Sequence, residues 1–332
     1  MTATLFCSSD DVSDLASPAD YVDAVRDGYR QRGEGAPAQP RSKFFRADPE
    51  GMLTTYAAVL PDTGAMGGYM YSAGFGAGDA WFMTPLFDAD SGAPLALLDG
   101  ASMNPHKTGA AGAVAVDELA REDSDTLAII GSGAQARGQL RATATVREFA
   151  EVRVYSPTPE SRESFAADAD DALEADVRAV DSSAAAVSGA DVVVTATRAT
   201  EPVFDGDDLE PGTHVTAMGQ YSPDAREVDT TTLERATYVP DLRDRATFDS
   251  GEFLQALEEG AMTEDDIHAE LGDIVADEAP GRTSDDEITL FDSGGTGIET
   301  VAAAYMLYER AEREDVGQTI DFAPASEALT GD

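Results

Sequence analysis

Short apolar segments alternate with longer segments of helical pattern in the second half of the chain. The apolar segments that predict strands are 126–130, 151–155, 177–180, 191–195, 214–218, 236–239 and 288–291. Strands that alternate with helices in this way are typical of a doubly wound parallel sheet with helices on both faces. We therefore predict an α/β fold for this half of the chain.

The first half has a different pattern, because turns rich in Gly, Pro and Asp separate its apolar segments. Strands are expected at 42–46, 53–60, 66–72, 80–87 and 94–98. Short strands joined by tight turns favour an antiparallel sheet. Helices are expected at 21–32, where Ser17 is a suitable N-cap, and at 101–120 and 296–312. Residues after 320 are expected to form a frayed tail.

The strand predicted at 126–130 runs directly into Gly131-Ser132-Gly133-Ala134-Gln135-Ala136. In a Gly-x-Gly-x-x-Ala turn the first glycine permits the tight turn, and the second lets a pyrophosphate approach the backbone. The small alanine permits close packing of helix on strand. A helical pattern at 135–149 follows, and the N-terminus of such a helix favours negative charge. The order of strand, turn and helix predicts a dinucleotide-binding unit.

The residue after the second of these strands, Ser156, bears on which dinucleotide is bound. An acidic residue normally ends this strand when the ribose 2′-hydroxyl of NAD is recognised. Ser156 is neutral, and its hydroxyl, the hydroxyl of Thr158 and the guanidinium of Arg162 could accept a 2′-phosphate. These residues favour NADP, and NAD stays open.

The chain has 332 residues and a net charge of −42, from 64 acidic and 22 basic residues. Such a surface repels nucleic acid and anionic membranes, so neither is an expected partner. An apolar content of 42% argues against disorder as the reason for this net charge. Adaptation to high salt, which screens repulsion among carboxylates, is the better explanation. The sequence has one cysteine, Cys7, no apolar run of the about 18 residues that a membrane span needs, and no secretory pattern. We therefore expect a halophilic, cytoplasmic protein.

Nearly all basic residues are arginine, and the two lysines are Lys43 and Lys107. Arg41 and Lys43 are two residues apart in a predicted strand, so both would project from one face of the sheet. Such a pair suits capture of a substrate carboxylate, and the alternative is an exposed pair at a sheet edge. Lys107 lies in the helix predicted at 101–120, where its ammonium could meet an anionic ligand; chance retention is the alternative.

The chain offers no pattern for a metal site. His106, His214 and His268 are too scattered to share an ion, and one cysteine cannot form a site. The segment 88–92 begins like a calcium loop but lacks the later acidic ligands. No metal ion is therefore predicted.

Eight segments carry a further signal through their order along the chain. They are Arg41-Ser42-Lys43-Phe44-Phe45-Arg46, 95–100, 107–111, 130–136, 194–198, 212–219, 226–229 and 290–295. Together they resemble the ornithine cyclodeaminase/μ-crystallin family over nearly the whole chain. The resemblance implies a Rossmann domain at 123–298 and a discontinuous α+β domain at 1–122 and 299–332. The second of these would carry substrate and form a homodimer.

Members of that family pass a hydride between a nicotinamide and the α-carbon of an amino acid or its imine. By position in the family pattern, Arg41 resembles the residue that binds the substrate carboxylate. Lys107 falls where the family usually has an arginine near substrate and nicotinamide. The residues that fall on cofactor-contacting positions are Ser132, Ala134, Gln135, Ser156, Thr197, Met218, Gly219, Gln220 and Ser293.

Two residues depart from the family pattern. Tyr69 stands where the family has a substrate-site lysine, and Tyr221 stands where cyclodeaminases have a catalytic aspartate. Cyclodeamination needs that carboxylate as a base, whereas a tyrosine is a poor base at neutral pH but a workable acid. The departure at Tyr221 favours imine reduction, where a proton is donated. Lys43 is the candidate replacement for the missing lysine.

The sequence therefore predicts an NAD(P)-dependent oxidoreductase of amino-acid metabolism, similar to a ketimine reductase or an alanine dehydrogenase. Its substrate would be a small α-imino or α-amino acid. Arg41 would hold the carboxylate, Tyr69 would line the site, and Lys107, Lys43 or Tyr221 would supply the proton. Two alternatives stay open: an ornithine cyclodeaminase, which releases ammonia and recycles NAD, and a μ-crystallin-like protein that binds NADPH without turnover.

Overall fold

The computed structural model describes residues 1–330, and the chain divides into two compact units. The first unit comprises Met1–Lys107 and the chain from Thr296 onward, and the second comprises Thr108–Gly295. The division falls inside helix α3 (Met103–Leu119), whereas the sequence suggested boundaries at 122/123 and 298/299. Residue 123 marks the change of pattern, but the helix before it already contributes Val116 to a core of the second unit.

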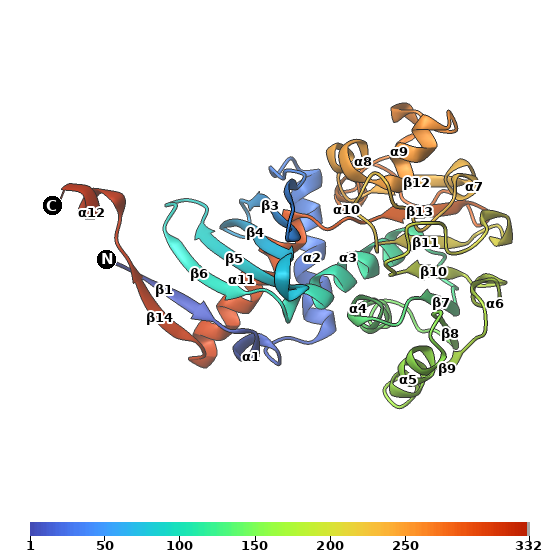
Figure 1. Cartoon of the computed structure of the whole chain (residues 1–332), viewed down its shortest axis with the longest axis horizontal. Coiled ribbons are helices and arrows are strands. Elements are labelled where there is room, and N and C mark those ends of the chain that lie inside the picture. The colour runs from blue at the N-terminus through green and yellow to red at the C-terminus, as the bar shows by residue number, and fades with distance from the viewer. Residues whose placement is uncertain (331–332) are drawn as a thin grey trace. The chain divides into compact units, whose positions relative to one another are not determined.

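The second unit is a parallel sheet of seven strands in the order β12-β13-β11-β10-β7-β8-β9 (Figure 1). Its strands are β7 (Thr126–Ile130), β8 (Glu151–Tyr155), β9 (Asp176–Ala179), β10 (Val192–Thr195), β11 (His214–Ala217), β12 (Ala236–Pro240) and β13 (Ile288–Asp292). Its helices besides α3 are α4 (Ala134–Thr143), α5 (Pro159–Asp170), α6 (Ser183–Val187), α7 (Thr230–Arg235), α8 (Arg243–Asp249), α9 (Gly251–Glu258) and α10 (Leu271–Val275). The predicted doubly wound α/β fold is confirmed.

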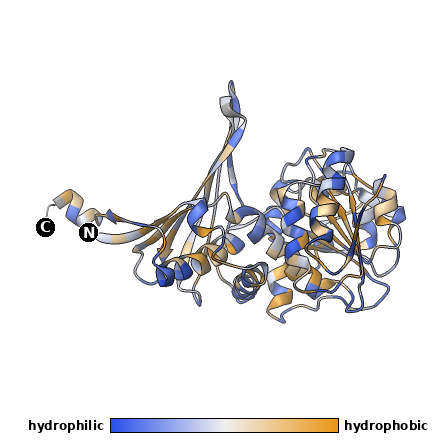
Figure 2. Ribbon diagram, turned by 90° about the horizontal axis from the view of Figure 1, so that it is seen from below, coloured by the Kyte–Doolittle hydropathy of each residue, from blue (hydrophilic) through white to orange (hydrophobic). Residues whose placement is uncertain are grey.

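Successive residues of the central strands belong alternately to two separate hydrophobic cores. Leu127 and Ile129 of β7 pack with α4 and α5, whereas Ala128 and Ile130 pack with α6 to α9 on the other face. Both faces are covered, so the strands are apolar throughout, as parallel strands usually are. Figure 2 shows these apolar strands at the centre of the unit, with helices and loops of mixed hydropathy around them.

The strand order places β7 beside β10. From this point the chain continues outward in both directions, through β8 and β9 on one side and through β11 and β13 on the other. In open α/β sheets ligands bind outside the carboxyl ends of the strands where the order reverses in this way. The fold alone therefore points to the loops that follow β7 and β10.

The first unit is a second sheet, in the order β14-β1-β6-β5-β4-β3-β2, antiparallel except between β1 and β6. Its strands are β1 (Thr2–Cys7), β2 (Ser42–Ala47), β3 (Glu50–Leu60), β4 (Ala65–Gly74), β5 (Asp79–Asp88), β6 (Pro94–Asp99) and β14 (Gln318–Phe322). Its helices are α1 (Ser9–Val12), α2 (Pro18–Gly33), α11 (Gly297–Glu314) and α12 (Ala325–Thr330), besides the start of α3.

Three features differ from the sequence prediction. Residues 318–322 form β14, although the part after 320 was expected in a frayed tail, and they pair with the N-terminal strand β1, which was not predicted either. These two segments are far apart in sequence, so no local pattern reveals their pairing. Helix α4 ends at Thr143 rather than 149, because Phe149 belongs to the loop before β8 and packs in the core. The expected N-cap at Ser17 is confirmed by its hydrogen bond from the Asp20 amide.

Helix α11 packs closely on one face of the first sheet. A side chain at Gly297 would place its Cβ 2.3 Å from the carbonyl carbon of Ala57 in β3, so the helix start requires glycine. Thr296 caps the helix in a capping box with Glu299, whose carboxylate is fully buried. This arrangement holds Glu299 against the sheet face on which α11 packs, which we call the inner face.

The opposite face of the first sheet exposes large apolar side chains. Phe44 pairs with Leu53, and Met70 pairs with Met83, so these residues project on one face with Trp81. They are 40% to 65% exposed. An apolar patch of this kind usually marks a surface that another molecule covers. No helix within residues 1–330 is long and apolar enough to cross a membrane.

Candidate cofactor and substrate sites

The turn after β7 has the geometry that its glycines predict. Gly131 has a φ of 127°, and an added Cβ would lie 2.4 Å from the carbonyl oxygen of Ala196. Its amide donates to the carbonyl of Tyr155, so the turn is fixed to the end of β8. Gly133 is the N-cap of α4 and has no heavy atom within 4 Å of an added Cβ. The backbone is therefore open at Gly133, where a pyrophosphate would approach.

The predicted residues at the end of β8 lie against this turn. Ser132 Oγ donates to Ser156 Oγ at 3.0 Å, and Ser156 Oγ is 3.3 Å from the carbonyl oxygen of Thr158, which precedes α5. Arg162 donates to the Ser156 carbonyl at 3.0 Å and pairs with Asp181 at 2.8 Å. The structure thus brings together the residues expected to recognise the ribose.

The loops after β10 and β11 also lie side by side. Gln220 Nε2 donates to the carbonyl of Ala199 at 2.7 Å, which joins the loop that contains Gly219 to the loop that contains Thr197. Met218, at the end of β11, donates its amide to the Thr195 carbonyl. Four predicted cofactor contacts therefore occupy one part of the sheet edge.

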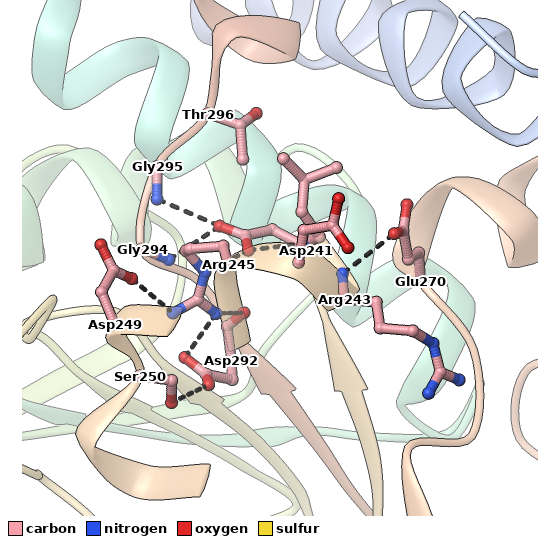
Figure 3. Close-up of polar contacts among 12 residues, drawn as sticks. Asp241, Arg243, Arg245, Asp249, Ser250, Glu270, Asp292, Gly294, Gly295 and Thr296 are labelled. Carbon is pink, nitrogen blue, oxygen red and sulfur yellow. Dashed lines mark hydrogen bonds and ion pairs between the residues drawn. The ribbon is translucent and has the colours of Figure 1, made fainter. Parts of the chain in front are cut away.

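The turn after β13 is fixed by a buried ion cluster that sequence reasoning missed (Figure 3). The Asp241 carboxylate accepts from the amides of Gly294 and Gly295 at 2.8 and 3.1 Å. Arg245 pairs with Asp241 and Asp292, and also donates to the Asp292 carbonyl at 2.8 Å. All three charged side chains are at most 1% exposed. The single guanidinium offsets one of the two negative charges, and further donors stabilise the carboxylates: the two glycine amides on Asp241, and the hydroxyls of Ser250 and Tyr238 on Asp292.

A spacing of four residues was the available signal for this cluster. Asp241, Arg245 and Asp249 recur at that interval, which places such residues on one face of a helical segment. The cluster positions Ser293, one of the predicted cofactor contacts. Within the described residues the buried Oγ of Ser293 and the buried Oε1 of Gln135 have no hydrogen-bond partner. Two polar atoms of this kind fit a polar ligand at the sheet edge.

Arg41 in the first unit is buried rather than exposed at an edge. It lies one residue before β2 and is 4% exposed. Its guanidinium stacks over the Tyr56 ring at 5.1 Å, and Nη1 is 3.5 Å from the Tyr71 hydroxyl. Lys43, in β2, is in register with Thr54, which in turn pairs with Tyr71. The two cations therefore belong to one face of the sheet, as predicted, and the exposed alternative fails for Arg41.

Lys107 and Tyr69 meet on the same inner face. Lys107 Nζ is 5.1 Å from the centre of the Tyr69 ring and 3.2 Å from a carboxylate oxygen of Glu299. Tyr69 donates its hydroxyl to the Gly100 carbonyl at 2.8 Å, and burial raises its pKa well above the ordinary value. Tyr69 therefore keeps its proton and serves as a wall beside the cation. Tyr221 belongs to the second unit, in the loop after β11, and is 36% exposed.

Glu299 was not predicted to belong to this site. Besides Lys107 it accepts from the amide and hydroxyl of Thr296, at 2.9 and 2.7 Å, and from the Tyr29 hydroxyl at 3.3 Å. The capping-box spacing of Thr296 and Glu299 is typical of a helix start and of nothing more. Nothing in the sequence indicated that this cap also binds Lys107.

Comparison with known proteins agrees with this arrangement. The sequence model of the ornithine cyclodeaminase/mu-crystallin family matches residues 3–315. The chain belongs to this family. It is 37% identical over 238 residues to a Delta(1)-pyrroline-2-carboxylate reductase of Bacillus cereus, covering 71% of this chain and 73% of that protein.

Two solved structures of the family are similar over nearly the whole chain. One is Thermococcus litoralis Delta(1)-pyrroline-2-carboxylate reductase in complex with NADH and L-proline, with 32% identity and a TM-score of 0.91 over 96% of this chain and 100% of that one. The other is an archaeal alanine dehydrogenase dimer with bound NAD, with 31% identity and a TM-score of 0.91 over 97% and 100%. The family's Rossmann and second domains are thus both present in this chain.

A matched pair of glycine variants tests the turn after β7. Gly131→Ala is expected to lower the free energy of unfolding by more than about 2 kcal/mol, because its Cβ collides with backbone at a positive φ. Gly133→Ala is expected to leave the Tm within about 2 °C of the natural protein, yet weaken NAD(P)H binding at least about tenfold. Thermal unfolding and calorimetric titration in concentrated KCl measure both. Normal NAD(P)H affinity in Gly133→Ala would contradict the placement of the pyrophosphate.

Proposed function

We propose that the protein is an NAD(P)-dependent oxidoreductase that reduces a small α-imino acid to the α-amino acid, and catalyses the reverse reaction. The observation that carries this proposal is the buried Arg41 guanidinium on the sheet face against which Lys107 of α3 lies, in a chain with a dinucleotide turn at Gly131. The relatives named above support it, because they include an imino acid reductase and an amino acid dehydrogenase.

Arg41 is the candidate for binding the substrate carboxylate. A guanidinium presents two parallel N–H groups that match the two oxygens of a carboxylate. The Tyr56 ring beneath it restricts its orientation, and burial strengthens its attraction for an anion. Arg41 therefore orients the α-carbon as well as binding the acid group.

Lys107 is the candidate for holding a proton at the substrate nitrogen. Glu299 favours the charged ammonium, since an opposite charge within hydrogen-bond distance stabilises the protonated form of a lysine. An ammonium beside an imine promotes its reduction by donating its proton to the nitrogen as the hydride reaches the carbon, which leaves the lysine as a neutral amine. The bound nicotinamide would supply the hydride. Lys43 and Tyr221 are the other candidate donors, and Tyr221 offers no carboxylate base of the kind that cyclodeamination needs.

Aromatic rings beside these cations favour a small or cyclic aliphatic side chain. Tyr56, Tyr69, Tyr71 and Phe82 lie in mutual contact, with ring centres 4.8 to 6.4 Å apart. They provide apolar surface and no charge for a second polar group. Pyrroline-2-carboxylate and the imine of pyruvate are the substrates of this type that we propose.

The cofactor site favours NADPH over NADH in our proposal. Ser156 places no negative charge at the end of β8, and Arg162 holds a cation within hydrogen-bond distance of the Ser156 carbonyl. The paired Asp181 side chain is 99% exposed, so solvent screens its opposing charge. A 2′-phosphate would therefore meet an arginine with little net repulsion.

The acidic surface and the exposed apolar face suggest a setting and a partner. A net charge of −42 suits a salt-rich cytoplasm, where screening limits self-repulsion. A second copy of the chain would cover Phe44, Leu53, Met70, Trp81 and Met83. We propose a homodimer through this face; the dimeric alanine dehydrogenase relative supports the dimer, and the exposed apolar side chains support the face.

Substrate and cofactor can be identified together. Purified protein in multimolar KCl is expected to oxidise NADPH, and NADH more weakly, with pyrroline-2-carboxylate or with pyruvate plus ammonia.

Arg41→Met is expected to lower kcat/KM by about 10²-fold or more, because the substrate carboxylate loses its buried partner. Among variants of the three candidate proton donors, Lys107→Met is expected to lower kcat more than Lys43→Met or Tyr221→Phe.

The same assays separate the alternatives. Proline and ammonia formed from ornithine without net change in nicotinamide absorbance would identify a cyclodeaminase. Tight NADPH binding with no turnover of any imine would identify a binding protein. Either result would contradict the proposed reduction.

The dimer is tested by a charge placed in the apolar face. Trp81→Asp is expected to convert a dimer into a monomer, since a carboxylate buried in that contact would lack a partner. Phe248→Asp is the control, because Phe248 is similarly exposed, at 58%, but lies in the second unit. Sedimentation in concentrated KCl measures the mass of each. A monomeric natural protein, or a Trp81→Asp variant that stays dimeric, would contradict the proposed interface.

A further inference from the structure

Glu227 is a buried carboxylate whose contacts join the ends of two strands. Its side chain is 0% exposed and accepts hydrogen bonds from three residues. Thr197 donates its amide at 2.7 Å, Gly219 donates its amide at 2.6 Å, and Thr195 donates its hydroxyl at 3.0 Å. Thr195 ends β10, and Gly219 follows the end of β11, so one carboxylate holds both exit loops.

The two loops pack around this carboxylate with no space to spare. A side chain at Gly219 would place its Cβ 2.6 Å from Glu227 Cδ and 2.3 Å from the Thr197 carbonyl oxygen. Burial raises the pKa of Glu227, while the side chain and amide of Thr197, the Gly219 amide and the Thr195 hydroxyl act in the opposite direction by binding the charged form. A buried carboxylate is unfavourable unless donors of this kind surround it. The shape of the loops and the charge on the Glu227 carboxylate therefore depend on each other.

A second buried acid fixes the backbone of Glu227. Glu252, near the start of α9, is 1% exposed and accepts the Glu227 amide at 3.0 Å. On the other side of the loops, Gln220 Nε2 donates to the carbonyl of Ala199. The chain of contacts thus runs from α9 through Glu227 to the loops after β10 and β11.

These loops lie on the nicotinamide side of the predicted dinucleotide site. In a doubly wound sheet each half of a dinucleotide lies over one half of the strands, with the pyrophosphate at the first turn. Ser156 after β8 belongs to the half that binds the adenine-linked ribose. Thr197 and Gly219, after β10 and β11, therefore belong to the half that receives the nicotinamide.

We propose that Glu227 is a positioning residue for the nicotinamide half of the cofactor: its carboxylate sets the two loops in the shape that receives it. This inference rests on the proposed function, since it assumes that a dinucleotide binds at Gly131. Glu227 itself touches no reacting group. Its effect passes through the amides of Thr197 and Gly219.

This role is tested by comparing how NADPH and NADH bind with how ADP binds. Glu227→Gln keeps the size of the side chain but turns one acceptor oxygen into an N–H donor, so one of the two loop amides loses its partner. We expect the Kd for NADPH and NADH to rise about tenfold or more, and the Kd for ADP, which lacks the nicotinamide half, to change less than about threefold. Calorimetry in multimolar KCl measures each ligand with the whole chain.

Thr195→Val is the matched control. It removes a buried donor to the same carboxylate but leaves the Thr197 and Gly219 amide contacts in place. It is expected to lower the Tm of the ligand-free protein and to leave the ratio of the Kd values for NADPH and ADP unchanged. If Glu227→Gln does not fold, Glu227→Asp keeps the charge but withdraws it from both loops, and the same change in ratio is expected.

The outcomes separate this inference from the proposed function. Equal weakening of NADPH and ADP in the Glu227 variant would show a general structural role and overturn the inference. Unchanged binding of both ligands, or a Thr195→Val variant that loses NADPH selectively, would also overturn it. Failure of the natural protein to bind NADPH or NADH would refute the proposed function itself, and the inference with it.

Discussion

Charged side chains removed from water hold the carboxyl ends of the parallel strands in place. Arg245 with Asp241 and Asp292 fixes the turn after β13, and Glu227 fixes the turns after β10 and β11. A buried charge is tolerated only where donors or opposite charges surround it, so each loop has one shape that satisfies its charge. Loops at such a sheet edge are ordinarily mobile, and here they form a preorganised surface for a ligand.

The interior charges and the surface charges of this chain respond differently to salt. Repulsion among the acidic residues that give the net charge of −42 acts through solvent and weakens as ionic strength rises. The Lys107–Glu299 pair is at most 1% exposed, so salt screens it little. Concentrated salt therefore relieves the repulsion that opposes folding while the buried contacts of both units persist.

Local sequence patterns predicted the parts of the fold that are local. The strand before Gly131 and the glycine turn identified the dinucleotide unit, because strand, turn and helix are consecutive in the chain. The pairing of β1 with β14 was missed, since those segments meet only in the folded sheet. Glu227, Arg245 and Glu299 were missed because one buried acid or arginine looks like any other in so charged a chain. Arg41 was predicted to share a sheet face with Lys43, but its stacking on Tyr56 was not predicted, because strand register is needed to bring the two side chains together.

In the proposed reaction a hydride passes from the nicotinamide to the substrate carbon next to the carboxylate that Arg41 would hold. Mass spectrometry of the product formed with NADPH deuterated at C4 of the nicotinamide follows this transfer. With pyrroline-2-carboxylate in concentrated KCl, one of the two C4-deuterated epimers of NADPH is expected to give proline that carries one deuterium at its α-carbon. Proline without deuterium from both epimers, or with deuterium only when the solvent is D₂O, would rule out this hydride transfer.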